Sequence, residues 1–321
     1  MKIISFKDIA DLNVQPLMCF DWAEAMIRSK KEALLPPKIS LKPYDGVFCN
    51  VMPSIIPSSD NTKWGGVKVV TRYPNRVPSL ESRILLMNAD SGEFVALMDG
   101  TWITTMRTGA VAAHSIMLLG KKDFATIGIM GLGNVSRSTL LILADKLRDR
   151  EFYVKLLRYK GQEEDFAKRF ASYKNLHFSF VDTAEEMVKG SDVVISGATY
   201  LPNDVCPDEY FDKGVLVQPI HTLGFTNCDL FFDKVFADDL GHVRHFKNFD
   251  KFKQFAEVCD VVNGNRPGRE NDDERILAYN IGVSVHDIYF AVAIYHMMQE
   301  RGILDSLNEI DMNDPTEKFW V

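Results

Sequence analysis

The regular alternation of apolar and helical runs that begins at Asp123 constrains the fold more than any other feature of the chain. Strands are expected at residues 124–130, 152–158, 177–181, 192–196, 214–219 and 234–238. Helices are expected at residues 134–150, 162–173 and 183–190, between the first four strands. Apolar strands separated by helices of this length form a parallel sheet with helices on both faces. We therefore predict an α/β protein with a doubly wound domain at residues 119–282.

A different pattern precedes this domain. One helix is expected at residues 21–34, because the pair Pro36–Pro37 cannot continue it. Residues 38–100 contain strand-forming runs and a hairpin turn, and a helix at 102–119 follows. This pattern predicts an α+β domain at residues 1–118. After Asp239 the chain is expected to be helical, and its long apolar helix from about 283 should pack on the first domain, so that residues 283–321 complete that domain.

Composition excludes several kinds of partner. The chain has 321 residues and a net charge of -7, without the basic surface that nucleic acids or anionic membranes require. Its longest apolar runs fall short of the roughly 18 residues of a membrane span. The five cysteines are scattered and show no metal-site spacing. Lys7 and Asp8 interrupt the position where a signal peptide needs its apolar run. We expect a cytoplasmic protein without a bound metal, nucleic acid or membrane.

A glycine-rich turn follows the first strand of the doubly wound domain. Gly131 permits a tight turn, and Gly133 permits the backbone to approach a pyrophosphate at a helix N-terminus. Ser136 replaces the usual third glycine with another small residue. The position of this turn between a strand and a helix is typical of the Rossmann dinucleotide-binding domain. The alternative is a structural glycine turn in a domain without a cofactor.

The end of the second strand bears on the choice of dinucleotide. An acid there would bind the ribose 2′-hydroxyl of NAD. Arg158 and Lys160 occupy this region instead, and the first acid is Glu163. NADP(H) is therefore favoured and NAD(H) remains possible. The alternative is that both basic residues are only solvated.

The sequence resembles the ornithine cyclodeaminase/mu-crystallin family. The resemblance covers most of the chain through PPKISL, MPSIIP, GGVKVVTRYPNR, DSGEFVALMDGTWITTMRTGAVAAHS, the glycine turn, NGNRPGRE and IGVSVHD. The run MDG..IT..RT.A is its most specific part. The resemblance implies a homodimer in which the N-terminal domain and the C-terminal helix bind the substrate and form the dimer.

The resemblance also implies residue roles. Lys68 corresponds to a lysine at the substrate carboxylate, and Arg107 to an arginine between that carboxylate and the cofactor. Lys38 stands where the family usually has an arginine, which keeps the charge and loses the bidentate fork. Asn280 and Ile281 correspond to the segment that closes over the nicotinamide and the substrate. The remaining implied cofactor residues are Arg83, Thr108, Asn134, Val135 and Thr199.

One departure from the family bears on the reaction. The catalytic aspartate of cyclodeaminases falls on Leu223, with His221 nearby, while Asp229 corresponds to a structural acid. Lys68 or His221 could transfer the proton that the chemistry needs. Each has a plainer interpretation, Lys68 as a solvated strand residue and His221 as a loop residue bonded to the backbone.

The sequence therefore predicts an NAD(P)H-dependent oxidoreductase that acts on the C–N bond of a small amino or imino acid. Two alternatives stay open. One is an ornithine cyclodeaminase, a lyase that converts ornithine to proline and ammonia. The other is a protein that binds NADP(H) and a small ligand without turnover, like mu-crystallin.

Overall fold

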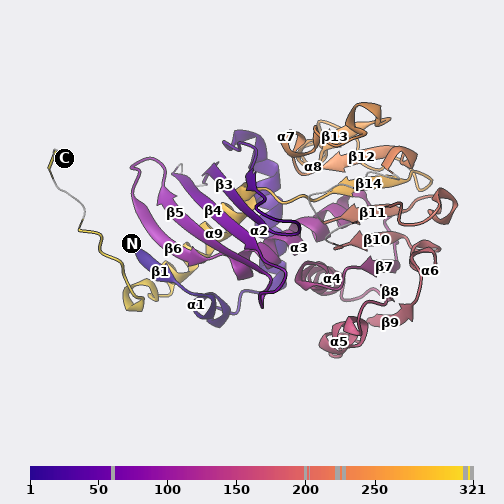
Figure 1. The fold of residues 1–321 in the computed structure, drawn as a ribbon, viewed down its shortest axis with the longest axis horizontal. Coiled ribbons are helices and arrows are strands. Elements are labelled where there is room, and N and C mark those ends of the chain that lie inside the picture. The colour runs from indigo at the N-terminus through magenta and orange to yellow at the C-terminus, as the bar shows by residue number, and fades with distance from the viewer. Residues whose placement is uncertain are drawn as a thin grey trace. The chain divides into compact units, whose positions relative to one another are not determined.

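The computed structural model describes residues 1–58, 62–198, 201, 203–220, 225, 229–313 and 317–318. The chain forms two compact units, and neither is continuous in sequence. The first unit consists of Met1–Val14, Glu32–Thr104 and Ser284–Val321, and the second of Gln15–Lys31 and Thr105–Val283. Each unit is built around its own sheet (Figure 1).

The described residues of the first unit form a six-stranded sheet with the order β1-β6-β5-β4-β3-β2. Its strands are β1 (Lys2–Ile4), β2 (Ile39–Leu41), β3 (Phe48–Pro57), β4 (Lys63–Arg72), β5 (Leu80–Asn88) and β6 (Phe94–Asp99). β1 is parallel to β6, and the other neighbouring strands are antiparallel. Helix α9 (Ser284–Glu300) packs along one face, against β3, β4 and β5 (Figure 1). α9 thus covers the N-terminal sheet.

The two faces of this sheet differ in exposure. Side chains alternate between the faces along each strand, and residues paired across strands share a face. One row across the face that packs on α9 is Ile4, Met98, Ile84, Lys68 and Met52, and all five side chains are buried. The row beside it on the opposite face is Ile3, Leu97, Leu85, Val67 and Pro53, and these residues are partly exposed. The core of the first unit therefore lies between the sheet and α9.

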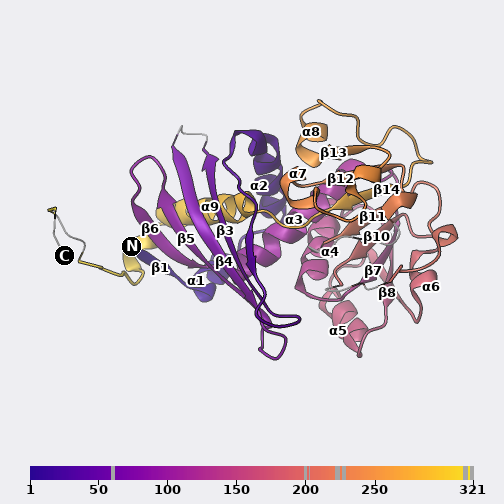
Figure 2. The same cartoon turned by 45° about the horizontal axis from the view of Figure 1, so that its top comes forward.

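The described residues of the second unit form an eight-stranded parallel sheet with the order β13-β12-β14-β11-β10-β7-β8-β9. Its strands are β7 (Thr126–Met130), β8 (Phe152–Leu157), β9 (Leu176–Val181), β10 (Val193–Ser196), β11 (Leu216–Pro219), β12 (Lys234–Ala237), β13 (Phe255–Glu257) and β14 (Ile276–Tyr279). From β7 the chain adds β8 and β9 on one side, and β10 and β11 on the other (Figure 2). In such a sheet, ligands bind at the carboxyl ends of the strands where the order reverses. The predicted doubly wound α/β fold is confirmed.

Two helices of the second unit, α2 and α3, lie outside the predicted boundaries. The helices of this unit are α2 (Pro16–Ser29), α3 (Thr101–Leu119), α4 (Asn134–Lys146), α5 (Gln162–Arg169), α6 (Ala184–Val188), α7 (Leu240–Val243) and α8 (Val258–Val262). α2 packs against α4 and α8, and α3 belongs to this unit from Thr105 onward. The predicted division at residue 118 therefore differs from the observed units at residues 15–31 and 105–118. α2 also begins earlier than expected, with Pro16 at the first helical position, where its missing N–H has no partner to lose.

The expectation of a helical chain after Asp239 is wrong for two segments. β13 and β14 add parallel strands to the second sheet, and β14 inserts between β11 and β12. Both strands are three or four residues long, and every residue of β14 is buried. β14 leads after a few residues into the apolar helix α9, and a short buried strand cannot be told from a buried helical segment by periodicity alone.

Candidate functional site

Lys68 is buried on the face of the first sheet that packs on α9. Its side chain is 1% exposed, and its Nζ donates a hydrogen bond of 2.6 Å to Oδ2 of Asp287 on α9. Asp287 is fully buried. The solvated alternative for Lys68 is therefore wrong, because β4 turns this residue inward between Met52 and Ile84.

Lys38 directly precedes β2, the strand at one edge of the first sheet. β2 begins one residue after Lys38, and its first residue, Ile39, pairs with Val51. Continuing this register by one residue places Lys38 beside Met52, which pairs with Lys68. Two strand spacings, about 10 Å, separate the backbones of the two lysines. Both lysines thus belong to the first unit, and their contacts with a substrate carboxylate stay predictions.

The predicted glycine turn connects β7 to α4 at the point where the strand order reverses. Gly131 has a φ of +74°, and a Cβ there would lie 2.3 Å from the carbonyl carbon of Gly197 at the end of β10. The Ser136 hydroxyl donates a 2.7 Å hydrogen bond to the Gly131 carbonyl. A Cβ on Gly197 would lie 2.4 Å from that hydroxyl oxygen. These contacts explain why the turn needs glycine at 131 and a small residue at 136.

Gly133 forms the open side of the turn. It caps α4 in an extended conformation, and no atom lies within 4 Å of the position that a Cβ would take. Asn134, which follows, is exposed, and Val135 is partly exposed. The first N–H groups of a helix have no partner within the helix, and such groups bind phosphate. The space beside Gly133 suits the pyrophosphate of a dinucleotide.

Arg107 lies on α3 against the segment that follows β14. Its side chain is buried, and a Cβ on Gly282 would lie 2.8 Å from its Nη1 atom. Gly282 has a φ of +79° and donates its N–H to Oδ2 of Asp238 at 3.0 Å. Burial raises the pKa of the Asp238 carboxyl. Thr108, next to Arg107, is also buried.

Asn280 and Ile281 extend from the end of β14 and are both buried. The Asn280 side chain accepts a hydrogen bond from Gln218 and donates one of 3.4 Å to the Ser115 hydroxyl. These bonds fix its orientation within the second unit. The two residues lie just before the Gly282 contact with Arg107, so the implied substrate and cofactor residues at 107 and 280–281 are brought together.

Arg158 follows the last residue of β8 and already contacts two carboxylates. Its guanidinium lies 3.2 Å from Glu163 on α5 and 3.2 Å from Asp182 after β9. Glu163 is buried and also accepts the N–H of Tyr159. Asp182 is 79% exposed. Lys160 is exposed and has a positive φ of 53°. The two basic residues that bear on the choice between NAD and NADP thus lie at the expected strand end, and Arg158 is paired with Glu163.

Arg83 lies in the first unit, on β5. It is half exposed and forms ion pairs with Glu81 and with Asp99 at the end of β6. Asp99 also accepts the N–H of Thr101 at the start of α3. This arrangement explains part of the MDG..IT motif, because the aspartate holds the helix start. The cofactor contact implied for Arg83 stays a prediction.

The sequence profile of the ornithine cyclodeaminase/mu-crystallin family matches residues 4–302. The chain belongs to this family. Among curated relatives, the nodulation efficiency protein NfeD of Rhizobium meliloti is 24% identical, over 94% of this chain and 97% of its own length. The Δ1-pyrroline-2-carboxylate reductase of Bacillus cereus is 26% identical, over 79% and 82%. The predicted membership is confirmed.

Solved structures of the cyclodeaminase/mu-crystallin type share this fold. The Δ1-pyrroline-2-carboxylate reductase of Thermococcus litoralis, in complex with NADH and L-proline, matches 94% of this chain and 98% of its own, with 23% identity and a TM-score of 0.79. An archaeal alanine dehydrogenase dimer with bound NAD covers 97% and 99%, with 21% identity and a TM-score of 0.80. A probable ornithine cyclodeaminase from Bordetella pertussis covers 94% and 98%, with 18% identity and a TM-score of 0.79.

Three positions of the family comparison lie outside the described residues. They are His221 and Leu223, in the loop after β11, and Thr199, after β10. Their roles stay predictions. Asp229, the structural acid of the resemblance, is described and buried, and it accepts a 2.7 Å hydrogen bond from Asn248.

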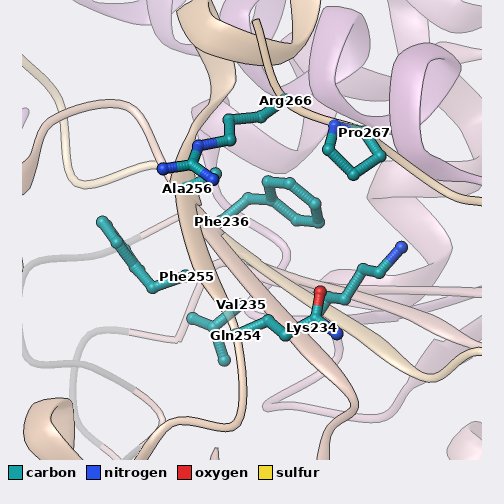
Figure 3. Close-up of a pocket in the computed structure, with 8 residues that line it drawn as sticks. All are labelled: Lys234, Val235, Phe236, Gln254, Phe255, Ala256, Arg266 and Pro267. Atoms are coloured by element: carbon teal, nitrogen blue, oxygen red, sulfur yellow. The ribbon is translucent and has the colours of Figure 1, made fainter.

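A pocket of about 310 Å³ lies elsewhere in the second unit, around β12 and β13 at one edge of the sheet (Figure 3). It is lined by Lys234, Val235, Phe236, Gln254, Phe255, Ala256, Arg266 and Pro267. None of these is a predicted site residue. β12 is separated from β7 by three strands, so this pocket is not the predicted dinucleotide site.

One cluster of the described residues resembles a metal site by spacing alone. Ligand atoms of Glu257, Cys259 and Asp260 lie within 4.8 Å of one another. Glu257 already binds the ammonium groups of Lys30 and Lys31. Burial raises the pKa of the Cys259 thiol to about 11, which keeps it protonated at neutral pH. A protonated thiol and a carboxylate that is already paired with two lysines are poor ligands for a divalent ion.

Sequence reasoning missed the partner of Lys68. Asp287 on α9 accepts a hydrogen bond from a residue on β4, 219 residues earlier in the chain. The available signal was an acid among the apolar residues of a helix that is buried on most sides. Such an acid needs a partner, because an isolated buried charge is costly.

Proposed function

We propose that this protein is an NAD(P)H-dependent oxidoreductase that acts on the C–N bond of a small amino or imino acid. The observation that carries the proposal is the turn at Gly131–Gly133, which closes tightly against β10 and leaves open space at the start of α4. Buried cations at Lys68 and Arg107 support a carboxylate ligand. Relatives with reductase and dehydrogenase names support the reaction type.

The bound dinucleotide would supply or accept a hydride at the carbon of the C–N bond. An iminium ion already carries the proton that its nitrogen keeps, so its reduction needs no further proton donor. The work of the chain is then binding and orientation. α4 and the glycine turn would hold the pyrophosphate, and Lys38, Lys68 and Arg107 would bind the substrate carboxylate.

We propose NADP(H) as the preferred cofactor, with NAD(H) as the alternative. Arg158 is oriented by the buried Glu163, while its second partner, Asp182, is largely exposed. A 2′-phosphate could displace the exposed carboxylate and keep the oriented guanidinium. Lys160 is a second exposed cation in the same loop, between β8 and α5. Thermal stabilisation by NADPH greater than that by NADH would support this choice.

Net oxidation or reduction is favoured over cyclodeamination. Ring closure with loss of ammonia needs a group that cycles a proton beside the substrate, and the family's aspartate position is Leu223. Cyclic imino acids with NADPH should therefore give loss of cofactor absorbance. Ornithine with catalytic NAD should give no proline. Proline formation would establish the cyclodeaminase alternative, and binding of NADPH without turnover of any imino acid would establish the binding-protein alternative.

A substitution at Arg107 tests the proposed contact with the substrate carboxylate. Arg107→Met should lower kcat/KM by about 30-fold or more, because a buried partner of the carboxylate is lost. Arg148→Gln is a matched control, since Arg148 is an exposed arginine on the same unit. Equal activity of Arg107→Met and the unmodified enzyme would remove Arg107 from the site.

We further propose a homodimer formed through the partly exposed face of the first sheet. Val67, Leu85 and Leu97 form an apolar row there, and the archaeal alanine dehydrogenase of the same fold is a dimer. Val67→Glu should shift the sedimentation coefficient to that of a monomer.

We propose a cytoplasmic location, which the state of the cysteines supports. Cys19, Cys49, Cys206 and Cys259 are free thiols, as expected in a reducing compartment. None of the helices in the described part of the chain combines the length and apolar character that crossing a membrane requires.

A further inference from the structure

Asp238 directly follows β12 and holds the chain that leaves β14 at two points. Its backbone N–H donates to the Tyr279 carbonyl at 3.1 Å, and its Oδ2 accepts the N–H of Gly282 at 3.0 Å. One residue thus binds both ends of the step from Tyr279 to Gly282. Asn280 and Ile281, which are predicted to close over the nicotinamide and the substrate, lie between these two points.

The glycine at the end of this step depends on Asp238 more than the asparagine before it does. Asn280 is fixed by its own side chain, which forms hydrogen bonds with Gln218 and Ser115. Gly282 takes a left-handed φ of +79° where the chain turns. Because it has no side chain, its position depends on its backbone groups, and the Asp238 carboxyl group holds one of them.

A carboxyl group is costly at this place. Asp238 is 6% exposed, and its second oxygen, Oδ1, is buried without a hydrogen-bond partner among the residues that the structure describes. A buried oxygen without a partner loses its hydration and gains no hydrogen bond in return. Burial also raises the pKa of this carboxyl group, although the Gly282 N–H opposes the shift. The bond from Gly282 to Oδ2 offsets part of this cost, which indicates that the acid secures the position of the glycine.

The position of Gly282 determines where Arg107 can lie. A Cβ on Gly282 would lie 2.8 Å from Nη1, 3.1 Å from Nη2 and 3.4 Å from Cζ of Arg107. The guanidinium group therefore packs against the α-carbon of this glycine, and the Arg107 side chain is buried. Close packing of this kind holds a long side chain in one rotamer. A shift of the turn would open space beside Arg107 and release it.

We propose that Asp238 is a positioning residue of the binding site. Through the Gly282 N–H it holds the turn at residues 279–282 in the place that orients the guanidinium of Arg107 for the carboxylate of the ligand. The inference rests on the proposed function and makes it more specific, because the affinity for a carboxylate then depends on a residue that does not bind it. Since Asp238 acts through the backbone, its acceptor oxygen matters and its charge does not.

The first test compares two substitutions of Asp238. Asp238→Asn keeps an acceptor oxygen and removes the charge, so the Kd of L-proline, measured by calorimetry with NADPH present, should change by less than about threefold. Asp238→Ala removes the acceptor and should raise this Kd by about 10-fold or more. Equal losses of affinity in the two variants, or no loss in Asp238→Ala, would overturn the proposal.

Asp239→Asn is the matched control for the loss of an acid. Asp239 is the next residue of the chain, and its carboxylate contacts Lys30 and His242. Its loss removes one carboxylate from Lys30, which is 8% exposed, so the melting temperature should fall. The turn at Gly282 keeps its contacts, so the Kd of L-proline should stay within about threefold. An equal loss of affinity in Asp239→Asn and Asp238→Ala would reduce the effect to general destabilisation and contradict the inference.

A double-mutant cycle tests whether Asp238 acts through Gly282. Gly282→Ala itself displaces Arg107, so in that background Asp238→Ala should raise the Kd of L-proline by less than about threefold. Full additivity of the two changes in binding free energy would show that Asp238 acts by another route and would contradict the inference.

A readout independent of any substrate is the exchange of the Gly282 amide hydrogen. Hydrogen-exchange mass spectrometry of the peptide at residues 279–283 should show exchange that is faster by about 10-fold or more in Asp238→Ala, but not in Asp238→Asn or Asp239→Asn. Unchanged exchange in Asp238→Ala would sink the inference even if L-proline binds. Faster exchange in a protein that binds no amino acid and reduces no imino acid would uphold the hold of Asp238 on the turn and reject the proposed function.

Discussion

The guanidinium of Arg107 lies directly against the backbone of Gly282, where a side chain would not fit. A Cβ on Gly282 would come within 2.8 Å of Nη1 and 3.1 Å of Nη2. The same glycine has a left-handed backbone and donates its N–H to Asp238. The contact connects α3 to the segment after β14, which carries Asn280 and Ile281, so the position of Arg107 depends on a residue that has no side chain.

Gly282→Ala should therefore impair binding as well as stability. The left-handed φ costs about 1–2 kcal/mol for any residue with a Cβ, and Arg107 must also move. Gly92→Ala is a matched control, because Gly92 has the same φ of +79° and nothing lies within 4 Å of its Cβ position. Urea denaturation should show a loss for both variants, and carboxylate affinity should fall only for Gly282→Ala. Unchanged affinity would show that the contact does not position Arg107.

Gly133 and Gly131 should separate cofactor binding from folding. Gly133→Val places a side chain in open space, so the free energy of unfolding should change by less than about 1 kcal/mol while the Kd of NADPH rises by about 10-fold or more. Gly131→Ala instead forces a Cβ against Gly197 and should cost about 2 kcal/mol or more. Tight NADPH binding by Gly133→Val would place the pyrophosphate elsewhere.

Arg158 and its carboxylate partners should decide the preference for NADPH. Arg158→Gln should weaken NADPH by about 10-fold or more and NADH very little, since a charge-assisted hydrogen bond is lost. Asp182→Asn removes a competitor for the guanidinium and should strengthen NADPH binding. Fluorescence titration of the unmodified protein and of both variants with each cofactor gives the six dissociation constants. If the unmodified protein binds NADH more tightly than NADPH, the preference proposed for Arg158 and Lys160 is wrong.

His114 should make the fold sensitive to mild acid. Burial on α3, beside Phe20, lowers the pKa of His114 to about 4, against about 6.5 in an unfolded chain. The unfolded state therefore binds the extra proton first, and stability should fall as the pH drops from about 6.5 to about 4, by at most about 3 kcal/mol. His114→Phe should reduce this slope, while His177→Gln, at an exposed site, should keep it. Equal slopes in all three proteins would exclude His114 as the cause.

The sequence predicted the strands that open the doubly wound sheet because each is a run of apolar residues next to a helix of clear polarity. It also predicted the glycine turn, since Gly131 and Gly133 follow a strand directly. It could not predict β14, because this strand is followed after only a few residues by the apolar helix α9 and the sequence marks no boundary between them. Nor could it join Asp287 to Lys68, because that pairing depends on where α9 packs. The assignment of α2 to the second unit likewise depends on contacts with α4 and α8.

The location of α9 has a consequence for the order in which the chain can fold during synthesis. The sheet of the first unit is translated before residue 100, but the helix that covers it begins at Ser284. On the ribosome, the Lys68 amine and the apolar residues of the same row stay uncovered until almost the whole chain, including α9, has been synthesised. The second unit can fold before that. We therefore expect nascent chains that stall between residues 100 and 284 to be substrates for chaperones, and to be recognised through the face of the early sheet.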